Sequence, residues 1–263
     1  MNKQGRIIVV YGSCLHGAGA STVAFSLGVV IQQVTSKKVL VVNLDNEMSC
    51  LERFIEGDIE IKHSLDNIKI YEENLKPEVI ENHSDIINEN LYLISKSKKG
   101  KTSNEFVDKL IQSGKRKFDF IVIDAGNSPN EKLLQGADIK MHISEYNKLI
   151  LSDVVNKVKN DDTIIVFNKF PLEYSSEMTI ANVVKKYNIT NEIFIINYDV
   201  DMFTDACERR SLYSFIIKNI GSKNLFINNM LEIALHVASK CKVKLQTKYE
   251  RKGLIGGWRL KIF

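Results

Sequence analysis

Short runs of consecutive apolar residues recur along the chain. They predict strands over 6–12, 38–44, 90–95, 118–124, 139–143, 163–168 and 192–197. Most of these runs are continuous rather than alternating, as in "RIIVVYG" at 6–12 and "FDFIVID" at 118–124. A continuous run is typical of a strand that is buried on both faces, as happens in a parallel sheet.

Apolar residues at helical spacing fill most of the intervals between these runs. They predict helices over 21–35, 103–115, 145–159, 177–188, 208–219 and 222–240. Because strands and helices alternate, we expect a doubly wound α/β fold whose mostly parallel sheet is flanked by helices. Ligands of such folds bind beyond the carboxyl ends of the strands.

The chain reads as one domain followed by a tail. Its 263 residues suffice for a single α/β domain with a large core, which we place at 1–240. Residues 58–89 are polar, acidic and only weakly periodic, so they predict a surface insertion of short helices within this domain. Residues 241–263 form a basic tail that contains aromatic side chains.

Charge is distributed unevenly between the domain and the tail. The chain has 36 Lys and Arg residues against 32 Asp and Glu residues, which gives a net charge of +4. Eight of the basic residues and one acidic residue lie between Lys240 and Phe263, which leaves 28 basic and 31 acidic residues in the body. A strongly basic tail indicates an anionic partner: lipid headgroups, nucleic acid or an acidic protein surface.

The last ten residues, "LIGGWRLKIF", combine the only Trp with aliphatic and basic side chains. This mixture suits a membrane interface, although Gly256 and Gly257 disfavour a continuous helix. Docking to a protein partner is an equal alternative, and DNA binding is a less favoured one. The residues assigned to this contact are Arg251, Lys252, Leu254, Ile255, Trp258, Arg259, Leu260, Lys261, Ile262 and Phe263.

The four cysteines are scattered and form no C-x-x-C pair. This pattern argues against a disulfide framework or a zinc site and for reduced thiols. No apolar run approaches the ~18 residues of a spanning helix, and the first residues lack the apolar core of a signal peptide. We therefore expect a cytoplasmic protein that can associate peripherally with the inner face of the membrane.

A glycine-containing loop, "SCLHGAGAST" at 13–22, follows the first predicted strand directly. A strand, such a loop and a helix that opens with Ser or Thr form the layout of a phosphate-binding P-loop. Gly19 takes the place of the last glycine and Ser21 that of the Mg²⁺-binding hydroxyl, whereas Cys14 replaces the first glycine and Ala20 the lysine. Backbone N–H groups and the helix N-terminus would still face a phosphate.

Polar residues follow other predicted strands at positions that would surround this loop. Asp45 would serve as a catalytic switch carboxylate, and Asp124 would hold Mg²⁺ together with Ser21. Gly126 would leave room for a γ-phosphate, and the amide of Asn168 would read the adenine edge. Because parallel strands end at one edge of a sheet, these residues together predict a nucleotide site.

The loop and the strand ends together resemble the MinD/ParA-type ATPases, whose deviant Walker A motif is K-G-G-x-G-K-[ST]-T. The resemblance covers roughly residues 5–240. Gly17, Gly19, Ser21 and Thr22 match this motif at the second glycine, the third glycine, the Mg²⁺ ligand and the last Thr.

Two further segments carry the resemblance. "VVNLDN" resembles the V-I-D-x-D strand end of the family, with Asn43 in place of the first Asp and Asp45 in place of the second. The stretch 197–215 resembles the segment that borders the adenine pocket and includes Asp199.

The resemblance implies ATP or ADP with Mg²⁺ as ligands, and a homodimer. It also places Leu15 where a signature lysine reaches across the dimer and Ala20 where a second lysine grips the β- and γ-phosphates. Each charge-assisted contact contributes ~1.5–3 kcal/mol, so we expect weakened ATP binding, which His16 could partly offset with a hydrogen bond. The predicted nucleotide-binding residues are Cys14, Leu15, His16, Gly17, Ala18, Gly19, Ala20, Ser21, Thr22, Asn168 and Asp199.

A degraded loop of this kind resembles those of the TadZ/CpaE-type localisation proteins of pilus and secretion machines. We therefore expect a nucleotide-responsive localisation or scaffold protein with weak or absent ATPase activity, which positions a membrane, pilus, secretion or conjugation machine. One alternative is an active partition-type ATPase that binds nonspecific DNA. The other is a nucleotide-free interaction module. A nicotinamide-dependent oxidoreductase is disfavoured because Gly17 and Gly19 follow the strand too late for the Rossmann fingerprint.

Overall fold

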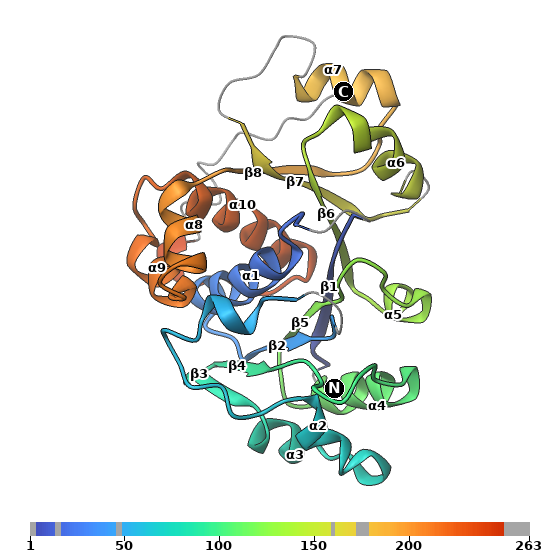
Figure 1. Cartoon of the computed structure of the whole chain (residues 1–263), viewed down its shortest axis with the longest axis vertical. Helices are drawn as coiled ribbons and strands as arrows, with labels where there is room; N and C mark the ends of the chain where they lie inside the picture. Colours follow the sequence, from blue (N-terminus) through green and yellow to red (C-terminus); the bar gives the residue numbers. More distant parts are fainter. Residues whose placement is uncertain (1–3, 14–16, 46–48, 159–160, 172–178, 250–263) are drawn as a thin grey trace.

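A computed structural model describes residues 4–13, 17–45, 49–158, 161–171 and 179–249. An eight-stranded sheet in the order β3-β4-β2-β5-β1-β6-β7-β8 forms its centre (Figure 1). The strands are β1 (Arg6–Gly12), β2 (Val39–Asn43), β3 (Asp85–Asn88), β4 (Leu91–Ile94), β5 (Phe120–Asp124), β6 (Ile139–Glu145), β7 (Ile164–Phe170) and β8 (Ile193–Asn197).

All neighbouring strands pair in parallel except β3 and β4, which pair antiparallel. The helices are α1 (Ala20–Thr35), α2 (Leu65–Lys69), α3 (Pro77–Asn82), α4 (Asn104–Gly114), α5 (Glu131–Gln135), α6 (Lys148–Val158), α7 (Ile180–Tyr187), α8 (Val200–Cys207), α9 (Leu212–Asn219) and α10 (Leu225–Lys240), with short 3₁₀ turns at Glu52–Phe54 and Glu72–Asn74. This arrangement confirms the predicted doubly wound α/β fold.

Helices cover both faces of the sheet, which explains the continuous apolar runs of its central strands. On β1, Ile8 and Val10 pack into a core with α1, α9 and α10. Ile7 and Val9 point to the opposite face and pack with α3 and α4. In Figure 1, α1 and α10 lie together on one side of the sheet, while α4 lies on the other. These four side chains of β1 are all buried, as expected of a strand that is covered on both faces.

The insertion at 58–89 contributes a strand that the sequence analysis did not predict. Its expected short helices are present as α2 and α3, but β3 also joins the sheet edge beside β4. This strand is short, and Ile86 in its middle is exposed. A half-exposed edge strand that mixes polar and apolar residues lacks the continuous apolar signature of the buried strands.

The helix predicted at 208–219 begins later in the structure, at Leu212, and is α9. A separate helix, α8, precedes it. The break lies at Arg210, whose φ of 57° is in the left-handed region. Ser211 N donates to Asp205 O over 2.8 Å and closes the turn between the two helices. Periodicity alone did not reveal this turn because no glycine or proline marks it.

The first residues of the tail pack against the domain. Gln246 N donates to Val34 O, in the last turn of α1, over 2.8 Å, and Tyr249 is buried in the same core as α1 and α10. The ten residues between Arg251 and Phe263 that were assigned to membrane or partner contact lie outside the described residues. Across the part of the chain that is described, no helix is both long and apolar enough to cross a membrane.

Candidate functional site

The loop between β1 and α1 begins the site. Gly17 and Gly19 have φ values of 94° and 91°, in the left-handed region that glycine adopts readily. Gly19 is the N-cap of α1 and has no side chain with which to cap the helix. Gly19 therefore contributes no side chain to the first N–H groups of α1, the kind of group that binds anions at a helix N-terminus. The predicted contacts of Cys14, Leu15 and His16 lie outside the described residues.

Asn168, near the end of β7, holds this loop in place. Its Nδ2 donates to Ala18 O over 2.8 Å, and its side chain is buried. A Cβ at Gly19 would lie only 2.2 Å from Asn168 Nδ2, so close approach as well as backbone conformation requires glycine there. The structure thus assigns the amide nitrogen to the loop, and the predicted adenine contact of Asn168 stays a prediction.

Asp124 ends β5 beneath the loop and is fully buried. Its Oδ1 accepts a hydrogen bond from Gly126 N over 3.3 Å, and its Oδ2 accepts one from Ser49 Oγ over 3.2 Å. Burial raises the pKa of Asp124 to about 6, although the hydroxyls of Ser21 and Ser49 and the Gly126 amide oppose the rise. A carboxylate held this way is ready to ionise when a cation binds.

Ser49 is a member of this hydrogen-bonded cluster that sequence reasoning missed. Besides its bond to Asp124, its Oγ lies 3.2 Å from Ser21 Oγ and accepts from Asn43 Nδ2 over 2.9 Å. It therefore joins the two residues that were predicted to bind Mg²⁺. Ser49 stands in a loop after β2 and in no motif, so no sequence signal pointed to it.

Asn43, where the family pattern has an aspartate, fits its surroundings as an amide. Its Nδ2 also donates to Glu52 Oε1 over 2.8 Å, and its Oδ1 accepts from Asp45 N over 3.0 Å. An aspartate could not donate to Glu52 and would instead place a second negative charge beside it. Glu52 in turn accepts from Lys96 N over 2.9 Å.

Asp45 occupies the space that Gly126 was expected to leave for a γ-phosphate. A Cβ at Gly126 would lie 2.7 Å from Asp45 Cγ, and the φ of Gly126 is 65°. The small residue therefore makes room for the Asp45 side chain. The Asp45 charge in turn contributes to the raised pKa of Asp124.

No protein-family model and no curated protein sequence matches the chain. Solved structures do match it along most of its length. A ParA family ATPase from Chlorobium tepidum TLS superposes with a TM-score of 0.74 at 17% identity, over 89% of this chain and 99% of that one. A chain of the MinC:MinD cell division protein complex from Aquifex aeolicus gives 0.68 at 14% identity, over 89% and 96%.

The septum site-determining protein MinD from Pyrococcus horikoshii OT3, complexed with Mg-ADP, gives a TM-score of 0.63 at 18% identity, over 89% of this chain and 96% of that one. The chain has the MinD/ParA fold. At these identities the likeness concerns the fold, and the roles of individual residues rest on their own geometry. The site described above lies at the carboxyl ends of β1, β2, β5 and β7, where doubly wound folds bind ligands.

Within this MinD/ParA fold, Asp199 serves as a helix cap. It is the N-cap of α8, where its Oδ1 accepts from Met202 N over 2.7 Å. Its Oδ2 accepts from Asn224 Nδ2 over 2.7 Å. Both carboxylate oxygens thus have protein donors, and the predicted nucleotide contact of Asp199 stays a prediction.

The oxygen atoms around Ser21 are suitable ligands for a magnesium ion. Ser21 and Ser49 offer hydroxyl oxygens, and Asp124 and Asp45 offer carboxylates, which are the hard ligands that Mg²⁺ prefers. Among the described residues, no three His, Cys, Asp or Glu side chains converge into a self-sufficient cage. Mg²⁺ held by one or two carboxylates and substrate phosphates does not need such a cage.

Proposed function

We propose that the chain is a nucleotide-responsive localisation or scaffold protein. It binds ATP or ADP with Mg²⁺ at the loop 17–22, and it hydrolyses ATP slowly or not at all. The observation that carries this proposal is the hydrogen-bonded chain from the half-buried Ser21 through the buried Ser49 to the buried Asp124, at the foot of a glycine loop. Burying a carboxylate beside two hydroxyls costs free energy. A bound cation, with the anion that accompanies it, would offset that cost.

Nucleotide binding would rest on backbone groups and the metal rather than on loop lysines. The open N-terminus of α1 supplies N–H donors, and Asp124 with Ser21 would hold Mg²⁺. The Pyrococcus horikoshii neighbour carries Mg-ADP on the same fold, which supports this choice of ligand.

We expect weak hydrolysis because of the residues at the lysine positions and around Gly126, where the sequence predicts the terminal phosphate. Ala20 stands at the lysine position and Leu15 at the signature lysine. The side chain of Asp45 fills the space over Gly126 and would repel a γ-phosphate while it stays there. We therefore expect Asp45, the predicted catalytic carboxylate, to act mainly as a sensor of the bound state.

The output of the switch is a homodimer through the loop face and a membrane or protein partner at the basic tail. A chain with this fold forms the MinC:MinD complex of Aquifex aeolicus, which supports a protein partner. The whole assembly would be peripheral to the membrane, at its inner face.

Isothermal titration calorimetry with Mg-ATP tests the site. Gly19→Ala would place a Cβ 2.2 Å from Asn168 Nδ2 and disturb the loop, so we expect it to abolish binding. Gly100→Ala is the matched control, because Gly100 also has a left-handed φ, of 106°, and no atom of the described residues other than its chain neighbours lies within 4 Å of its Cβ position. Equal binding by the wild type and both variants would exclude the loop as the site.

A nucleotide-free interaction module is the second candidate function. It is favoured by one observation, the Asp45 side chain beside Gly126, which suits a protein that binds no γ-phosphate. A module of this kind would give no calorimetric signal with Mg-ATP or Mg-ADP in the wild type, so the same titration separates the two functions.

A further inference from the structure

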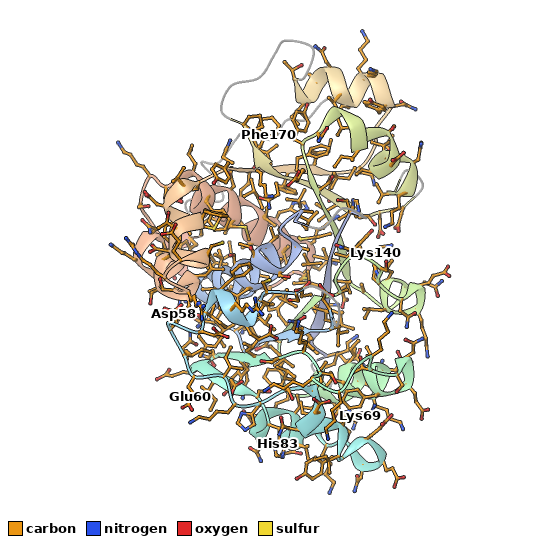
Figure 2. The ribbon with its side chains drawn as sticks, in the orientation of Figure 1. Asp58, Glu60, Lys69, His83, Lys140 and Phe170 are labelled. Atoms are coloured by element: carbon orange, nitrogen blue, oxygen red, sulfur yellow. The ribbon has the colours of Figure 1, made fainter. Side chains whose placement is uncertain are left out.

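The end of β7 carries a lysine beside the loop that lacks one. Lys169 follows Asn168, which pins the loop, and precedes Phe170, which Figure 2 labels at the end of the strand. Lys169 Nζ lies 4.0 Å from the position of a Cβ on Gly17. Among the described residues, apart from the chain neighbours of Gly17, no other atom lies within 4 Å of that position. The ammonium group therefore lies next to the loop from outside it.

The backbone of Lys169 is bent in a way that presents this side chain. Its φ of 52° lies in the left-handed region, which is unfavourable for a residue other than glycine. The pairing of β7 with β8 shifts register between Phe167 and Phe170, across this residue. Asn168 and Phe170 are buried, whereas Lys169 is exposed. Strained conformations of this kind concentrate at functional sites.

Lys169 has a partner that a ligand can replace. Its Nζ contacts Glu145 Oε1, on β6, over 2.5 Å, with side-chain exposures of 43% and 39%. Glu145 stands opposite Asn168 in the register of β6 and β7. An ion pair that is this exposed contributes little stability, so a phosphate chain with several negative charges can compete with one carboxylate for the ammonium.

A second lysine near the site is less suited to this role. Lys96 Nζ donates to Ser49 O over 3.0 Å, and its backbone N donates to Glu52. It therefore fixes the loop that presents Ser49, on the side of the predicted metal. Its loss would disturb Ser49 directly, whereas the partner of Lys169 is an exposed carboxylate.

We propose that Lys169 is the phosphate-binding cation of this protein, supplied from the end of β7 in place of the loop lysines that Leu15 and Ala20 replace. Glu145 holds the ammonium until the polyphosphate of a nucleotide displaces it. This inference rests on the proposed nucleotide binding at the loop. It adds that the charge complementary to the phosphates comes from a different element than in the K-G-G-x-G-K-[ST]-T pattern.

Calorimetric titrations of Lys169→Gln and Lys169→Arg with Mg-ATP, Mg-ADP and AMP test the proposal. We expect Lys169→Gln to raise the Kd for Mg-ATP about 10- to 100-fold, as the loss of a charge-assisted contact predicts. Lys169→Arg should stay near the wild type, and AMP should lose less than ATP. Lys240→Gln is the matched control, because Lys240 also pairs with a half-exposed carboxylate, Glu192, at the N-terminal end of β8.

Glu145→Gln separates a binding role from a structural one. If the Lys169–Glu145 ion pair only stabilises the end of β7, Glu145→Gln should lower nucleotide affinity as much as Lys169→Gln does. That result would overturn the proposal. If Lys169 binds phosphate, Glu145→Gln should leave affinity unchanged or raise it several-fold, because the ammonium is then free. Thermal unfolding should show the same Tm for all of these surface variants.

The remaining outcomes are also decisive. Equal affinity of the wild type and Lys169→Gln for Mg-ATP would refute the role of Lys169 and leave nucleotide binding standing. Equal losses for AMP and ATP would place the lysine at the nucleoside and not at the polyphosphate, against the proposal. A wild type that binds no nucleotide would remove the proposed function, and this inference with it.

Discussion

Individual polar residues decide whether the site is a degraded copy or a rearranged one. Asn43 stands where the MinD/ParA pattern has an aspartate, and it donates to both Ser49 and Glu52 and accepts from the Asp45 amide. Asp45, Asp124 and Ser21 could be expected near the loop from the sequence because each stands at a strand end or in a motif, and their roles stay predictions. The Ser49 hydroxyl could not be expected there, because only the folded chain brings it between Ser21 and Asp124.

Introducing the aspartate of the MinD/ParA pattern at Asn43 should harm this protein. Asn43→Asp would set a carboxylate against Glu52, where the amide now donates over 2.8 Å. We expect a loss of about 1–3 kcal/mol in the free energy of unfolding at neutral pH, measured by urea denaturation. The double variant Asn43→Asp/Glu52→Gln should regain most of it, since the new glutamine amide can donate to the new carboxylate. Stability equal to that of the wild type in the single variant would contradict this account.

Buried strands and their helices were predictable at the element scale, whereas edges and turns were not. β1 and β5 can be recognised in the sequence by their continuous apolar runs, because helices cover both faces of the sheet. β3 is a half-exposed edge strand, and the turn between α8 and α9 rests on a left-handed Arg210 rather than on a glycine. Such features depend on tertiary pairing, which local periodicity does not record.

The start of α8 allows capping and nucleotide binding by Asp199 to be separated. Asp199→Ala should lower the free energy of unfolding by about 1 kcal/mol, because Met202 N loses its acceptor. Asp199→Ser keeps a capping oxygen and should recover most of that stability. Nucleotide affinity measured on the serine variant then reports the adenine pocket alone. A serine variant that is as unstable as the alanine variant would refute the capping role.

Two buried side chains, Asp124 and His142, make the stability of the whole fold depend on pH in opposite directions. The pKa of Asp124 is about 6 in the folded protein and 3.8 ordinarily. The contribution of Asp124 to the free energy of unfolding is therefore full below pH 3.8 and is lost as pH rises through 6. Burial, aided by Lys157, lowers the pKa of His142 from 6.5 to about 4. The contribution of His142 is therefore present above pH 6.5 and is lost as pH falls through 4.

Each response amounts to roughly 3 kcal/mol, and the two oppose each other between pH 4 and 6. Compared with the wild type, His142→Phe should lose stability as pH rises across this window, and Asp124→Asn should gain it. Urea denaturation at half-unit steps of pH measures both slopes. Parallel curves for the three proteins would show that neither group is perturbed as described.

The end of the described chain and the candidate site lie at opposite ends of α1. The described chain ends at Tyr249, and Gln246 contacts the last turn of α1, whereas the glycine loop precedes its first turn. An α-helix of 16 residues spans about 24 Å. About 24 Å therefore separates the start of α1, beside the glycine loop, from the helix end that Gln246 contacts.

Deleting residues 250–263 tests the tail while every residue of the loop at 17–22, Ser49 and Asp124 stays in the chain. The variant retains the buried Tyr249, so it should keep the wild-type Tm and the wild-type Kd for Mg-ATP. It should no longer float with vesicles of anionic lipid, whereas the wild type should float in a salt-sensitive way. Undiminished flotation of the shortened chain would remove the tail as the membrane anchor.

Thermal unfolding of the wild-type protein with increasing Mg-ATP tests the central claim, nucleotide binding at the loop above Asp124, most directly. A ligand that binds only the folded state adds about 2.7 kcal/mol of stability at 100 times its Kd. We predict a Tm that rises with the logarithm of Mg-ATP concentration, and a much smaller rise when EDTA removes the metal. A Tm that stays constant up to millimolar Mg-ATP would contradict the account.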